Sequence, residues 1–77
     1  MLFRTRSLPD KISEYLRSQP ETGMGYQIVT VLTNDGKIFE RVHILDASEI
    51  STVDGNADIP FNPYDIVRVE VTHDKTF

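Results

Sequence analysis

An Asp-Gly turn between two stretches of β-forming residues is the feature that most constrains the fold of this chain. The turn, Asp35-Gly36, separates residues 26–33 from residues 37–45. Asp-Gly flanked by alternating apolar residues is a strong short-range sign of a β-hairpin. We therefore predict two neighbouring antiparallel strands in the middle of the chain, the first over about 26–33 and the second over about 37–45.

The turn permits two registers for this hairpin. A two-residue loop would pair Ile28 with His43, whereas a type I turn with Gly36 in a left-handed bulge pairs Ile28 with Val42. We choose the second register because it collects apolar residues on one face, namely Tyr26, Ile28, Leu32, Ile38, Val42 and Ile44. This register turns Glu40 toward the same face. It also leaves a second, half-apolar face, which requires either a strongly curved sheet or a cover.

A short helix is predicted ahead of the hairpin, over residues 7–18. Ser7 and Asp10 have the spacing of a capping box, and Pro9 is tolerated in a first helical turn. Pro20 is expected to end the helix near Ser18. One apolar stripe follows helical spacing and consists of Leu8, Ile12, Tyr15 and Leu16. A helix of about three turns is unstable alone, so we expect this stripe to dock on the sheet.

The remaining segments complete a small α+β domain. We predict a turn at 46–48, a strand at 49–53, a loop at 54–58, an extended segment at 59–61, one helical turn at 62–65 and a last strand at 66–73. The expected fold is a single domain over 1–77, with one helix packed on a strongly curved antiparallel sheet of about four strands (26–73). Residues 1–6 are expected to be a flexible arm and residues 74–77 a tail.

The order of elements resembles, in outline, the SH3-like and Sm-like small barrels. In those folds, too, a helical turn precedes the last strand, and the Sm-like members begin with a helix. No sequence motif of either family is present, so the resemblance implies an alternative fold, a small barrel, and assigns no functional residue.

Composition excludes several classes of function. The chain has 77 residues and no cysteine, which excludes disulfides, thiolate metal sites and a thiol nucleophile. The net charge of −4 opposes general nucleic-acid binding, because that binding depends on cationic side chains. No apolar run is long enough to span a bilayer, and the first residues lack the apolar core of a signal peptide. We expect a cytoplasmic protein with no membrane contact.

The loop at 54–58 carries the sharpest candidate for ion binding. Alternate oxygen ligands on a turning loop can converge on calcium, and the spacing here approaches that of an EF-hand at Asp54, Asn56, Asp58 and Asp65. The pattern departs from that motif at Ile59, where glycine is expected. A polar turn is the simpler interpretation, and calcium binding is kept as an alternative function.

No motif indicates catalysis or a bound cofactor. His43 and His73 are the only imidazoles, and Asp74 follows the second, so a shared metal site is conceivable. Glu40 would have a raised pKa if it were buried in an apolar pocket. Neither arrangement supplies a nucleophile, a second catalytic group and a pocket together. We therefore expect a protein that is not an enzyme and needs no cofactor.

Interaction with other chains is the function that the sequence favours. The half-apolar second face of the hairpin, or the edge of the last strand, would bind a protein partner or a second copy of the chain. The expected contact residues are Tyr26, Val29, Val31 and Phe39. A homo-oligomer is expected, since small domains often gain support from self-association.

Binding of RNA or single-stranded nucleic acid by a small barrel is a further alternative. The cationic residues that would meet phosphates are Arg4, Arg6, Lys37 and Arg41, and Tyr26 would stack on bases. The negative net charge makes a nucleic-acid partner less expected than a protein partner.

Overall fold

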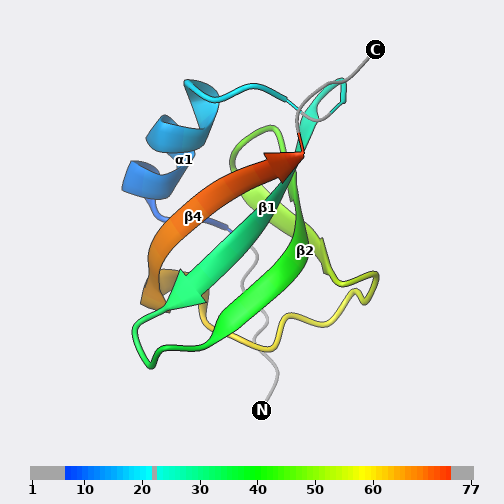
Figure 1. The fold of residues 1–77 in the computed structure, drawn as a ribbon. Coiled ribbons are helices and arrows are strands. Elements are labelled where there is room, and N and C mark those ends of the chain that lie inside the picture. Colours follow the sequence, from blue (N-terminus) through cyan, green and yellow to red (C-terminus); the bar gives the residue numbers. More distant parts are fainter. Residues whose placement is uncertain (1–6, 22, 74–77) are drawn as a thin grey trace.

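The central hairpin forms around the Asp35-Gly36 turn. The computed structural model describes residues 7–21 and 23–73, and in it β1 (Tyr26–Thr33) and β2 (Ile38–Leu45) pair antiparallel (Figure 1). Gly36 has φ +84° and donates its N–H to Thr33 O at 3.0 Å, while the Thr33 N–H donates to Lys37 O at 3.0 Å. This is the predicted turn with a left-handed glycine bulge.

Side chains reinforce the turn from within. The Asp35 carboxylate accepts a hydrogen bond from the Thr33 hydroxyl at 2.5 Å and another from the Lys37 N–H at 3.3 Å. These bonds, together with the charge of Lys37, hold the pKa of the Asp35 carboxyl below its usual value. The hydroxyl of Thr33 makes the largest contribution to this shift.

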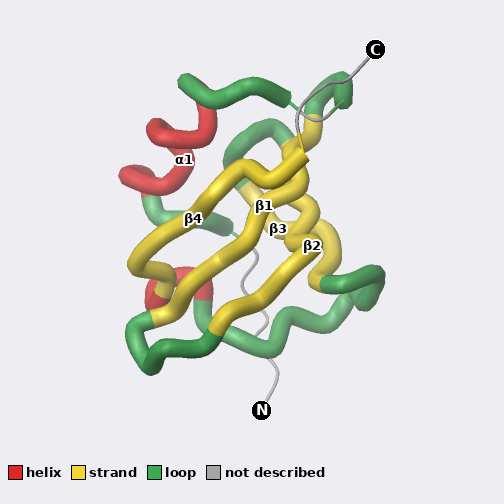
Figure 2. The backbone as a smooth tube through the Cα atoms, viewed as in Figure 1, coloured by secondary structure: helices red, strands yellow, loops and turns green. Residues whose placement is uncertain are grey.

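The described residues form one α-helix, one short 3-10 helix and a four-stranded antiparallel sheet. The helix α1 covers Asp10–Arg17, the 3-10 helix η1 covers Pro63–Asp65, and the outer strands are β3 (Glu49–Val53) and β4 (Ile66–His73). The strand order is β3-β2-β1-β4. Figure 2 shows β3 behind the hairpin, so the sheet curves strongly. The expected α+β fold is confirmed.

The sheet is open. Within the described ranges β3 and β4 occupy opposite edges and do not pair with each other, so the alternative of a closed small barrel is wrong. No helix in this part of the chain is long and apolar enough to cross a bilayer. The expectations of an arm at 1–6 and a tail at 74–77 concern residues outside the description.

A bulge in β2 changes the register halfway along the hairpin. Near the turn Leu32 lies opposite Ile38, as predicted. Farther along, two residues of β2, Glu40 and Arg41, lie opposite one residue of β1, and Arg41 has φ 53°. Beyond this point Ile28 lies opposite His43, so the predicted pairing of Ile28 with Val42 is wrong there.

The extra residue reverses the alternation of inward and outward side chains in β2. Phe39 packs inward before the bulge, Val42 is fully buried after it, and Glu40 is exposed rather than turned into an apolar face. In β1 the buried residues are Gln27, Val29, Val31 and Thr33. The core therefore lies on the face that we expected to be half-apolar and in need of cover. Its apolar members are Leu8, Leu16, Val29, Val31, Val42, Ile44, Ala47, Ile50, Val53, Ile59, Phe61, Ile66 and Val69.

The helix begins later than predicted. Ser7 does not cap it; this residue forms a β-bridge with Glu49, and the Leu8 N–H donates to Ser48 O at 2.9 Å. Pro9 precedes the first helical residue, and no side chain caps that end. The capping box is therefore wrong, because the backbone of Ser7 and Leu8 pairs with the start of β3 instead.

The C-terminal third follows the sequence closely. The side chain of Asn62 accepts a hydrogen bond from the Tyr64 N–H at 3.0 Å and thereby caps η1. β3 and β4 occupy the predicted ranges. The register between β1 and β4 shifts twice. Leu32 pairs with Arg68 whereas Thr33 pairs with Ile66, which leaves Val67 without a direct register partner on β1, and Val29 pairs with Val71 whereas Ile28 pairs with His73.

Candidate functional site

The residues predicted to contact a partner do not form a free surface. Val29 and Val31 have no exposed area, and Phe39 is half-buried with its ring centroid 4.7 Å from that of Phe61. Tyr26 is half-buried and stacks on His43 at 5.6 Å between centroids. The two valines therefore belong to the core and not to an exposed contact surface, because the bulge brings Val42 onto their face.

The cations proposed for nucleic-acid contact are dispersed. Lys37 lies at the hairpin turn, where its Nζ is 3.8 Å from Asp35. Arg41 forms a salt bridge with Asp54, and its Nε donates to Asp54 Oδ1 at 2.6 Å. Arg4 and Arg6 lie outside the described residues. Lys37 and Arg41 thus each lie beside a carboxylate, which reduces the positive charge available to bind phosphate.

One carboxylate of the predicted calcium site already has a local partner. Asp54 pairs with Arg41, whereas Asp65 belongs to η1 and its carbonyl accepts a hydrogen bond from the Asn34 N–H at 2.9 Å. In the stretches 7–21 and 23–73, no group of three or more His, Asp or Glu residues is placed to hold a metal ion. The calcium hypothesis for Asp54, Asn56, Asp58 and Asp65 gains no support from this arrangement.

The histidines lie on either side of β1. His43 of β2 and His73 of β4 are both register partners of Ile28, so their backbones are separated by the width of β1. Asp74 lies outside the described residues. The ring of His43 stacks on that of Tyr26.

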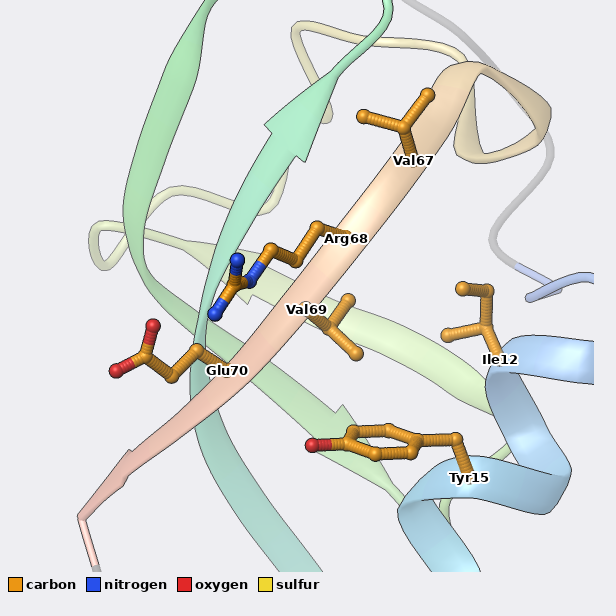
Figure 3. A pocket seen from close by; sticks show the side chains of 6 residues that line it. All are labelled: Ile12, Tyr15, Val67, Arg68, Val69 and Glu70. Carbon is orange, nitrogen blue, oxygen red and sulfur yellow. The ribbon is translucent and has the colours of Figure 1, made fainter.

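A groove between α1 and β4 is the strongest candidate for a binding site. It has a volume of about 320 Å³, and α1 lies beside β4 at one edge of the sheet (Figure 1). Figure 3 shows two side chains, Ile12 and Tyr15, extending from the helix toward the strand, and Val69 extending toward them. The residues that line the groove are Ile12, Tyr15, Val67, Arg68, Val69 and Glu70.

The backbone of β4 forms part of the groove wall. Arg68 and Glu70 line the groove, although Figure 3 shows their side chains extending to the opposite side of the strand from Ile12 and Tyr15. β4 is the last strand at its edge of the sheet. Among the described residues, no backbone hydrogen bond reaches 67–70 from outside the β1–β4 ladder. An edge strand directs every second N–H and C=O away from the sheet, toward a potential partner strand.

A buried glutamine fixes the helix that forms the other wall. Gln27 is 2% exposed, and its Nε2 donates to Leu16 O at 2.8 Å. The same group lies within hydrogen-bond distance of Pro20 O at 3.2 Å and Gln19 O at 3.3 Å. Leu16 is itself almost fully buried. The C-terminal end of α1 is thus tied to β1, and the groove is bounded by a helix and a strand that are both held to the core.

The sequence identified the parts of this groove but not their arrangement. Ile12 and Tyr15 belong to the predicted apolar stripe, and the last-strand edge was expected to take part in binding. In the structure only Leu8 and Leu16 of that stripe are buried, while Tyr15 is 45% exposed. Leu8 precedes α1, so the helix itself carries three apolar positions of the stripe, of which only Leu16 is buried. The sequence signal for the groove was this surplus of apolar positions over the contacts that one short helix makes with the core.

The groove brings two kinds of surface together. Its lining combines apolar side chains with an accessible strand edge. Comparisons of the chain with protein-family models, with curated proteins and with solved structures gave no match, so the geometry alone carries the functional inference.

Proposed function

We propose that this protein is a non-enzymatic interaction module that binds an extended segment of a protein chain by strand addition at the edge of β4. The observation that supports the proposal is the position of this edge within an apolar groove, opposite Ile12 and Tyr15 of α1. In strand addition the backbone of the edge provides most of the affinity, and flanking pockets select alternate side chains.

The two sides of β4 would select different side chains on the incoming segment. On the helix side, Ile12, Tyr15 and Val69 favour apolar residues. On the other side, Arg68 and Glu70 are exposed and favour residues of opposite charge. Because successive side chains of a strand alternate between faces, the preferred segment alternates apolar and charged residues.

Exposed apolar residues beside the edge support this assignment. Soluble proteins usually protect edge strands with charges or bulges, and β4 has both near Val67 and Arg68. Nevertheless Val67 is 58% exposed and Tyr15 is 45% exposed, and both line the same groove. A partner strand would cover both side chains, and burial of apolar area favours association.

Selection from random linear peptides tests the proposal. The protein is immobilised at low density and exposed to a displayed library of peptides about as long as a strand. We expect the selected peptides to alternate apolar and charged residues. Their affinity, measured by fluorescence anisotropy, should fall at least about tenfold with Val67→Lys and with Tyr15→Ser.

Matched controls separate the groove from general surface effects. Ile38 is 65% exposed and Tyr64 is 66% exposed, and neither lines the groove. Ile38→Lys and Tyr64→Ser make the same chemical changes there and should leave the affinity unchanged. Equal losses with the control variants and the groove variants would contradict the proposal, as would a library that yields no binder to a chain that is also monomeric.

A further inference from the structure

We propose that the segment bound at this edge is β4 of a second copy of the chain, in a symmetric dimer whose two β4 strands pair antiparallel about an axis through Val69. The inference rests on the proposed function, since it assigns an occupant to the same groove. It predicts one sheet that continues from one protomer into its partner.

Symmetry restricts the possible registers. When two β4 strands pair antiparallel, directly opposite residues must point to the same face of the sheet. Side chains on one face of a strand are an even number of positions apart, so the residue numbers of two opposite residues differ by an even number or are identical. The two-fold axis must therefore pass through a residue and not between two residues. Four residues of β4 line the groove and are candidates for that position, namely Val67, Arg68, Val69 and Glu70.

Charge selects one of these four registers. An axis through Val67 would place Arg68 opposite Ile66 and Glu70 opposite Tyr64, so neither charge would meet an opposite charge. An axis through Arg68 would place two arginines opposite each other, and an axis through Glu70 would place two glutamates opposite each other. An axis through Val69 places Arg68 opposite Glu70 of the partner subunit, and by symmetry this contact occurs twice. Opposite charges directly across a strand pair stabilise it, and like charges destabilise it. The sequence Arg-Val-Glu is thus complementary to itself only in the register centred on Val69.

Both charged side chains are available for this pairing. Arg68 and Glu70 are exposed, and neither forms an ion pair with any other residue in 7–21 or 23–73. They extend to the same side of β4, away from the helix (Figure 3). A charged side chain on a neighbouring strand could therefore pair with each of them at this edge.

The apolar side of the strand fits the same arrangement. Val69 would lie opposite Val69 of the partner subunit, on the face that carries Ile12 and Tyr15. Val67 lies at the irregularity of β4, is 58% exposed and extends away from Ile12 and Tyr15 (Figure 3), and the partner strand would cover it at the end of the pairing. The groove side chains of both protomers would then meet over the paired strands.

Charge reversal tests the dimer and its register together. Sedimentation velocity of the full chain, from about 1 µM to about 1 mM, should show a monomer–dimer equilibrium, as expected of a small interface. Arg68→Glu places two glutamates opposite each other across the paired strands, and Glu70→Arg places two arginines there. Each single variant should weaken dimerisation at least about tenfold.

Two further samples, in which opposite charges again face each other, test whether dimerisation is regained. The double variant R68E/E70R exchanges the charges and should regain the dimer. An equimolar mixture of the two single variants should form a mixed dimer, because one chain then carries two acids and the other two bases at these positions. The far-ultraviolet circular dichroism of each variant should match that of the wild type, since both positions are exposed.

The outcomes distinguish this inference from the proposed function. A wild-type chain that is monomeric up to about 1 mM, or single variants that dimerise as tightly as the wild type, would overturn the dimer. Folded single variants that fail to associate when mixed would overturn the register centred on Val69. If peptides are nevertheless selected at the groove and lost with Val67→Lys, the strand-addition site stands and its partner is a different chain.

Discussion

At the scale of single residues, Gln27 connects the core with the candidate site. Its amide nitrogen donates to carbonyl oxygens at the end of α1, the closest being Leu16 O at 2.8 Å. Its other atom, Oε1, is buried and has no hydrogen-bond partner among the described residues. An unpartnered buried oxygen lowers the stability that Gln27 can contribute. We therefore assign to Gln27 the role of holding the C-terminal end of α1 in place.

Two substitutions at Gln27 should differ in a defined order. Gln27→Leu removes the donor but also removes the unpartnered oxygen, so we expect a loss of about 1 kcal/mol in the free energy of unfolding. Gln27→Glu places a carboxylate against carbonyl oxygens and should lose more, about 2–3 kcal/mol at neutral pH. Urea denaturation measures both values. The same changes at the more exposed Gln19 serve as controls and should have little effect on stability. If Gln27→Glu were as stable as Gln27→Leu, the hydrogen bonds from Gln27 to the end of α1 would not stabilise the fold.

At the scale of secondary-structure elements, local chemistry was predictable where one short segment decides the geometry. The left-handed glycine at Gly36 and the asparagine cap at Asn62 both follow from nearby residues, and both are confirmed. The bulge at Arg41 was not predictable, because arginine carries no preference for positive φ and alternation can be counted from either end of β2. The bulge turns Val42 and Ile44 to the face of Val29 and Val31, so this face, which was predicted to be a surface, forms the core.

The candidate site shows the same division between local and long-range information. The apolar stripe of α1 and the alternation of β4 were visible in the sequence. Their juxtaposition was not, because the start of the helix depends on the pairing of Ser7 with Glu49 and its end depends on Gln27. These are contacts between segments far apart in the chain. Sequence reasoning could therefore name Ile12 and Tyr15 as members of a docking stripe, but could not show that they border an open strand edge.

The bulge itself leads to a prediction about β2. Arg41 has φ 53°, a conformation that is unfavourable by about 1–2 kcal/mol for a residue with a side chain. Arg41→Gly removes this strain and also the exposed salt bridge with Asp54, which is worth at most about 1 kcal/mol. We expect the glycine variant to remain within about 1 kcal/mol of the wild type in urea denaturation.

A β-branched residue at the same position should behave differently. Arg41→Val removes the same salt bridge but resists positive φ, so it should be about 1–3 kcal/mol less stable than the wild type. The comparison between the two variants isolates the backbone, because both lose the contact with Asp54. A valine variant as stable as the glycine variant would show that the bulge is not held in this conformation in solution.

At the scale of the whole molecule, the small size of the chain connects its stability with its assembly. A chain of 77 residues buries only about 60% of the surface that its unfolded state exposes. The sheet is open, and its β4 edge lies in an apolar groove. Pairing of two β4 strands would remove one edge from each protomer and extend the sheet, and small domains often gain stability in this way.

This connection predicts that unfolding depends on protein concentration. When a dimer unfolds to two separate chains, each tenfold rise in total concentration stabilises the folded dimer by about 1.4 kcal/mol. Above the dissociation constant of the dimer, the urea midpoint of the wild type should therefore rise with concentration. The midpoint of Arg68→Glu should stay constant over the same range, because its charges oppose pairing, while R68E/E70R should behave like the wild type. A wild-type midpoint that does not change with concentration would mean that the fold draws no stability from a second copy, and the edge of β4 would then have to be explained by a different partner.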